Sequence, residues 1–173
     1  AKGYFEEALR KDPEFALAYS GLADSHVYLA FFGTGAPSSS FRSAQEAVRH
    51  AITLDANIGE AHDTQGVLNW RYNWDWNAAE REFNQALILS PSYSCAHEDR
   101  AEYLAFRGRR DEAKAEMAKV LEFDQGVSSS LTEEGVDYLL RDFEGLVEAG
   151  RRGVASNPNE WVEHYYLGVG YEG

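Results

Sequence analysis

One spacing of small and apolar residues recurs along the whole chain. Ala1, Phe5, Ala8 and Pro13 are separated by four, three and five residues, and the same spacing returns at 44–56, 79–91, 113–125 and, in degraded form, 146–158. The closing positions 13, 56, 91, 125 and 158 are 43, 35, 34 and 33 residues apart. Positions four and three residues apart lie on one face of a helix, so the pattern predicts repeated helices that pack through that face.

The residue types within the spacing explain how such helices would pack. Small residues such as Ala8 and Ala86 let a neighbouring helix approach, and Phe5 and Phe83 fill the space beside them. A closing Pro cannot continue a helix, so each unit reads as a helix pair with a short turn. We expect helices at about 2–11, 14–32, 42–55, 59–71, 77–89, 94–107, 110–123, 129–140, 144–156 and 160–171.

A second set of residues falls in the first helix of each pair. It comprises Leu22-Ala23 with His26, Gln65-Gly66, Gly135 with Tyr138, and Leu167-Gly168 with Tyr171, and the turn GRRDEA runs from Gly108 to Ala113. With a period of about 34 residues, the whole chain resembles the tetratricopeptide repeat (TPR) family. The resemblance implies an all-α fold, a right-handed superhelix of antiparallel helix hairpins, or α-solenoid.

The repeat positions also suggest how the chain is organised. We expect a single TPR array over 1–173, with a partial repeat at 1–15, repeats at about 16–58, 59–93, 94–127 and 128–160, and a partial repeat at 161–173. The sequence begins at Ala1 rather than Met, and both ends fall inside a repeat. We therefore expect a fragment of a longer protein.

Four longer segments carry a narrower resemblance. They are DPEFALAYSGLAD (12–24), the Gly/Pro/Ser stretch at 31–41, YNWDWNAAEREFNQAL (72–87) and HYYLGVGYE (164–172). Together they resemble the C-terminal TPR region of bacterial signalling proteins, in which repeats follow a winged-helix DNA-binding domain or a class III (adenylate) cyclase domain, often with a TolB-like segment. The resemblance implies a non-catalytic sensory or protein-binding module of a cytoplasmic regulator, whose parent chain could be membrane-anchored.

Composition excludes several function classes. The 173 residues include 16 Lys and Arg against 29 Asp and Glu, a net charge of −13, so a surface that neutralises nucleic-acid phosphates is not expected. Cys95 is the one cysteine, so an internal disulfide is impossible. The longest apolar run, 27–32, is far shorter than the roughly 20 residues that span a bilayer, so no membrane partner is expected.

Two departures from the period need an explanation. About nine extra residues fall at 31–41, where Gly and Pro should break the helix and Ser38–Ser40 could cap the next one before Arg42. We expect an elongated loop there, packed by its own phenylalanines or, alternatively, gripping a ligand. One extra residue falls near 69–77, beside three of the four tryptophans, where Trp76 could staple the turn or the cluster could bind a partner.

Residues with chemical potential form no catalytic or metal-binding pattern. His62, His97 and His164 share one repeat position, which places them about 10 Å apart, too far to share a metal. Cys95 and His97 should diverge on a helix, and Ser128–Ser130 suit a helix N-terminus. The carboxylates of Glu80, Glu82, Glu133 and Glu134 should form solvated helix faces. We expect no catalysis, metal or cofactor.

The family resemblance indicates a binding surface, because the first helix of each pair lines the concave side of a TPR superhelix. The matching groove residues are Asp24, Tyr28, Asp63, Trp70, Arg71, Glu98, Glu102, Phe106 and Tyr165. This lining is acidic in the first three repeats and would attract a basic protein or peptide segment with apolar anchors. The alternatives are an assembly scaffold that self-associates, or a small-ligand sensor that uses 31–41 and the Trp cluster.

Overall fold

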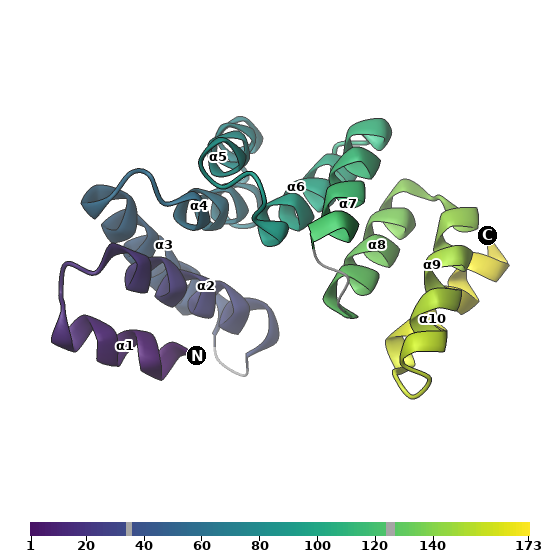
Figure 1. Ribbon diagram of the computed structural model, residues 1–173, viewed down its shortest axis with the longest axis horizontal. Coiled ribbons are helices and arrows are strands. Elements are labelled where there is room, and N and C mark those ends of the chain that lie inside the picture. The colour runs from purple at the N-terminus through teal and green to yellow at the C-terminus, as the bar shows by residue number, and fades with distance from the viewer. Residues whose placement is uncertain (34–35, 124–126) are drawn as a thin grey trace. The chain divides into compact units, whose positions relative to one another are not determined.

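A computed structural model describes residues 1–33, 36–123 and 127–173, without the side chains of 127–131. All regular elements of these residues are helices, so the all-α expectation is confirmed (Figure 1). They are α1 (Lys2–Lys11), α2 (Ala16–Phe32), α3 (Pro37–Leu54), α4 (Gly59–Arg71), α5 (Trp76–Leu89), α6 (Ser94–Phe106), α7 (Arg110–Phe123), α8 (Val127–Leu140), α9 (Phe143–Ser156) and α10 (Trp161–Glu172). None of these helices combines the length and the hydropathy needed to cross a bilayer.

The helices form two compact units, Ala1–Ala96 and His97–Gly173, which are described separately. In the first unit α2 packs against α1, α3 and α4, and α4 packs against α3 and α5. In the second unit α8 packs against α7, α9 and α10, and α9 packs against α10. Contacts between successive helices, together with those of α2 with α4 and of α8 with α10, are the pattern of stacked helix hairpins.

Side-chain caps and turn residues set the helix boundaries. Asp75 begins α5 by accepting a hydrogen bond from the Ala78 N–H at 2.9 Å, and Asp142 begins α9 by accepting one from the Gly145 N–H at 3.2 Å. Each such cap stabilises a helix by about 1 kcal/mol. Gly108, with a φ of 70°, occupies the left-handed region in the turn between α6 and α7, where glycine carries no steric penalty.

Small residues let the helices of a hairpin come into close contact. In the first unit Ala23, Ala44, Ala51 and Ala61 are fully buried in one cluster between α2, α3 and α4. In the next hairpin the ring of buried Phe83 lies directly over Gly66, and a Cβ added to that glycine would be 2.7 Å from the ring. The close approach predicted from the small residues is therefore present at these positions.

The expected elongated loop at 31–41 is wrong, because most of this segment is helical. Helix α2 continues to Phe32, and α3 begins at Pro37 rather than at 42, so the two helices reach 17 and 18 residues. Proline suits the first helical turn, where its missing N–H has no partner to lose. The expected serine cap is also wrong, since Ala36 is the N-cap and Ser39 Oγ donates back to its carbonyl at 2.7 Å.

A few sequence-based expectations fall on parts of the chain that the structure does not describe. Thr34 and Gly35, the closing position Gln125 and the Ser128–Ser130 side chains lie outside the described residues.

A pair of glycine substitutions tests the close-packing argument. Gly66→Ala should lower the free energy of unfolding by about 1–3 kcal/mol, because the new methyl group meets the Phe83 ring in a packed core. Gly168→Ala is the matched control at the same repeat position in α10, where the added Cβ has no neighbour within 4 Å. Gly168→Ala should raise the free energy of unfolding by up to about 1 kcal/mol, because alanine has a higher helix propensity than glycine. Equal effects in urea unfolding would contradict the packing account.

Candidate partner-binding surface

An acidic patch in the first unit consists of Asp24 on α2, Asp63 and Thr64 on α4, and Tyr93 just before α6. Thr64 Oγ1 donates a hydrogen bond to Asp24 Oδ1, which joins the two helices. Asp24 stays open to solvent on one side, but surrounding protein atoms displace water from its carboxyl and raise its pKa to about 6. The pKa of the Tyr93 hydroxyl is also raised, first by burial and then by the charges of Asp24 and Asp63.

A pocket of about 540 Å³ lies beside Asp24, between α1 and α2. Its lining residues are Ala1, Lys2, Phe5, Gly21, Asp24, Ser25, Tyr28 and Leu29. Most of this wall is apolar, the Asp24 carboxylate supplies a negative charge, and the Lys2 ammonium in the same lining pairs with Glu6 at 3.4 Å. Such a pocket suits an apolar side chain that has a cationic neighbour.

A tyrosine patch in the second unit consists of Tyr138 on α8 and of Tyr165 and Tyr166 on α10. The Tyr166 ring centroid lies 6.1 Å from that of Tyr138 and 5.4 Å from that of Tyr165, within the range of aromatic contact. Burial raises the pKa of the Tyr166 hydroxyl, and the charges of Glu134 and Glu102 raise it further. The sequence pattern indicated Tyr165 as a groove residue but not Tyr166, which no repeat rule places in contact with a partner.

The other predicted groove residues differ in exposure. Trp70 is 3% exposed and lies under the Arg71 guanidinium, whose carbon is 4.1 Å from the ring centroid. Asp63 is 4% exposed, so both residues support the surface from beneath. Tyr28 and Phe106 are exposed, and Glu98 is half-buried and accepts a hydrogen bond from Thr132 at 3.1 Å.

The aromatic residues invoked by the small-ligand alternative pack against one another. Phe41 stacks on Tyr72 with ring centroids 4.8 Å apart, and Phe31 meets Phe41 edge-on at 5.3 Å. The Arg71 guanidinium also lies over Phe31 at 5.1 Å. Phe41 is buried among these contacts, whereas Phe31 remains 42% exposed, so the aromatic side chains pack mainly against one another, as the packing interpretation expects.

Comparison with known proteins gives the same architecture. No family model matches the chain, and no curated protein matches it in sequence. Among solved structures, TTC0263, a thermophilic TPR protein of Thermus thermophilus, is 15% identical, with a TM-score of 0.77 over 96% of this chain and 87% of that one. YrrB, a TPR protein with an unusual peptide-binding site, is 18% identical, with a TM-score of 0.61 over 94% of this chain and 79% of that one. The chain has the tetratricopeptide-repeat fold.

Histidines at one position of the TPR pattern connect α4 and α10 to the turns before them. His62 Nε2 is 3.0 Å from the Ala56 carbonyl oxygen, and His164 Nε2 is 2.9 Å from that of Pro158, six residues earlier in both cases. On the other side of its ring, His62 Nδ1 is 2.7 Å from Glu82 Oε2. In the described part of the chain, no group of three or more His, Cys, Asp or Glu residues is arranged to hold a metal ion.

A buried pair of acids contradicts the expectation that Glu134 is solvated. Glu134 on α8 and Glu163 on α10 are both 0% exposed, and Gly153 on α9 leaves room for the Glu163 carboxyl. Burial raises the pKa of Glu134 to about 8, with help from the neighbouring Glu163 carboxyl. Two carboxyls in contact retain a proton between them, so the pair holds α10 to α8 best when one acid is protonated.

The acid pair predicts a pH dependence of stability. The folded pKa of Glu134 lies above the unfolded value of about 4.3, so the folded state binds more protons between roughly pH 4 and 8 and its stability falls as the pH rises through that window. Glu134→Gln keeps the shape without the charge and should raise the free energy of unfolding at pH 8 by about 1–3 kcal/mol. Urea unfolding at pH 5 and pH 8 measures this effect.

Glu148→Gln is the matched control for this measurement. Glu148 is exposed on α9, so the loss of its charge should leave the pH slope unchanged. An equal change of slope in both variants would show that the buried pair is not its source.

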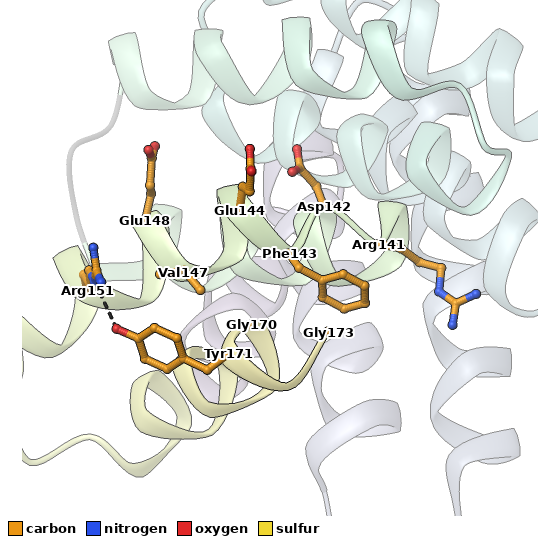
Figure 2. Close-up of a pocket in the computed structure, with 10 residues that line it drawn as sticks. All are labelled: Arg141, Asp142, Phe143, Glu144, Val147, Glu148, Arg151, Gly170, Tyr171 and Gly173. Carbon is orange, nitrogen blue, oxygen red and sulfur yellow. Dashed lines mark hydrogen bonds between the residues drawn. The ribbon is translucent and has the colours of Figure 1, made fainter.

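A second pocket, of about 720 Å³, lies on the side of α9 and α10 shown in Figure 2. Phe143 and Val147 on α9 face Gly170 and Tyr171 on α10, and Arg151 Nε donates a hydrogen bond to the Tyr171 hydroxyl at 3.1 Å. Asp142, Glu144 and Glu148 extend from the opposite side of α9 (Figure 2). The pocket is therefore an open apolar strip with charged residues along its edge.

Proposed function

We propose that this TPR array binds an extended segment of a partner protein that carries basic side chains and apolar anchors. The observation that carries the proposal is the acidic patch beside an apolar pocket, with Asp24 belonging to both. The family resemblance places these residues on the concave side, which the even-numbered helices would line. A peptide-binding site in one TPR protein of similar fold supports the same type of ligand.

The negative charge of the chain favours a basic partner segment over an acidic one. The chain has a net charge of −13, and the acidic patch would repel an acidic tail. A basic segment would be steered toward this surface, and its apolar side chains would contribute affinity by leaving water. The proposal includes no catalysis, nucleic acid or cofactor.

We further propose that the module is the sensory arm of a cytoplasmic bacterial regulator. The narrower sequence resemblance, in segments such as 12–24 and 72–87, supports this context. Sequencing the gene upstream of Ala1 tests it, since a winged-helix or cyclase coding region would support the proposal and a coding region for unrelated domains would contradict it.

Self-association is the second candidate, favoured by the open strip on α9 and α10. Trp161 and Tyr171 are strongly exposed on α10, and Tyr171 lines the strip itself. Large exposed apolar surfaces mark protein contacts in soluble proteins. A mass that rises with concentration in sedimentation would support this candidate, and a monomer over the whole range would exclude it.

Selection from a phage-displayed library of random 12-residue peptides tests the peptide-binding proposal. Selected sequences should carry a net positive charge and at least one apolar residue, because they must complement the acidic patch and its pocket. Asp24→Lys with Glu60→Lys should weaken a selected peptide by about tenfold or more, as measured by calorimetry. Glu60 is the half-buried acid on α4 whose charge acts on Asp24. An acidic or uncharged consensus would contradict the proposal.

Asp111→Lys with Glu122→Lys is the matched control for the charge reversal. Both residues are exposed on α7, an odd-numbered helix, and the double change alters the net charge by the same amount. This control should retain most of the affinity. A loss equal to that of the Asp24 and Glu60 variant would show that only net charge matters and that the assigned surface is wrong.

A further inference from the structure

The tyrosine patch presents open aromatic rings on two helices that touch. Tyr138 is 45% exposed and Tyr165 is 52% exposed, while Tyr166 is half-buried between them. The patch exists because α8 packs directly against α10, so side chains of two different repeats meet. Rings that are fixed by their neighbours lose little entropy when a ligand covers them.

Aromatic rings elsewhere in the chain are in contact with arginine guanidinium groups. The Arg71 guanidinium lies over Trp70, and that of Arg151 lies 5.7 Å from the centroid of Tyr171. Among the described residues, no arginine or lysine lies over Tyr138, Tyr165 or Tyr166. Tyr138 and Tyr165 therefore keep exposed ring area that could accept a cation.

A carboxylate near the rings gives the patch a negative potential. Besides burial, Glu134 on α8 and Glu102 on α6 are among the groups that raise the pKa of the Tyr166 hydroxyl, together with Tyr165 and Tyr138. Glu102 is half-buried at the surface, whereas Glu134 is fully buried and, with a pKa of about 8, is mostly neutral at pH 7. A cation held against the rings would therefore gain both π contact and Coulomb attraction.

We propose that the tyrosine patch recognises an arginine side chain of the partner segment, in preference to lysine. This inference rests on the proposed peptide-binding function and states that the second unit of the chain prefers arginine in the bound partner segment. A guanidinium is planar, weakly hydrated and able to stack on a ring while donating to a carboxylate, whereas an ammonium is a compact and strongly hydrated charge. Open rings with a nearby carboxylate therefore discriminate between the two cations.

Four capped peptides test the inference by titration against the ¹⁵N-labelled chain in NMR. The probes are Ac-Leu-Arg-Leu-Arg-NH₂ and its lysine, citrulline and proline counterparts. Citrulline keeps the planar shape without the charge, lysine keeps the charge without the plane, and proline tests simple ring stacking. The arginine peptide should bind about fivefold or more tightly than each of the others. It should also shift the amides of 138, 165 and 166.

Variants locate the effect on the patch. Tyr138→Leu with Tyr165→Leu should lower arginine-peptide affinity to that of the lysine peptide. Tyr171→Leu is the matched control, an exposed tyrosine of the same helix whose ring already carries Arg151, and it should change nothing. Circular dichroism checks that each variant keeps its helices.

The outcomes separate this inference from the proposed function. Equal binding of the arginine and lysine peptides would overturn arginine recognition while leaving basic-segment binding intact. Equal binding of the uncharged proline or citrulline peptide would count against both, because charge would then contribute nothing. Arginine selectivity that survives in the double variant would also overturn it. Failure of all four peptides to bind, together with no basic consensus from the phage library, would overturn both.

Discussion

The arrangement of this chain depends on the few positions where one helix can approach another closely. Gly66 accepts the Phe83 ring, and the Cα of Leu167 lies 3.0 Å from where a Cβ of Gly150 would be. These contacts fix the distance between the helices of a hairpin and between neighbouring hairpins. The even-numbered helices α2 and α4, and likewise α8 and α10, come into contact as a result, and both candidate surfaces form across those contacts.

The same logic explains a buried charge that would otherwise be costly. Gly153 has no side chain, so the carboxyl of Glu163 enters the space beside α9 and reaches Glu134. An isolated buried carboxylate would neutralise itself, and a pair achieves this by sharing a proton. The acid pair therefore joins three helices under the tyrosine patch and contributes to the potential that Tyr166 experiences.

The spacing of small and apolar residues predicted the helices well, because small residues at helical spacing mark the positions where two helices pack closely. Prediction failed at 37–41, where Pro37 was interpreted as a breaker although it begins α3. The ambiguity is physical, since proline ends a helix when it falls inside one and favours a helix when it falls in the first turn. Only the length of the following apolar pattern could have decided between the two.

The candidate site was less predictable than the fold. Spacing identifies which face of a helix a residue occupies, but not whether a neighbouring repeat covers that face. Glu134 looked solvated because its partner Glu163 is 29 positions away, and Thr64 and Tyr166 gave no signal until the adjacent helix was placed beside them. Contacts between repeats depend on helix rotation, which single-helix periodicity does not determine.

The two units would hold a cationic partner by different forces. In the first unit the attraction comes from carboxylates, chiefly Asp24, whose charge fades as its raised pKa of about 6 is approached from above. In the second unit it comes from ring faces and from Glu102, and the fixed quadrupole of the rings does not titrate near neutral pH. Acidification toward pH 6 should therefore weaken the contact made by the first unit more than the contact made by the second.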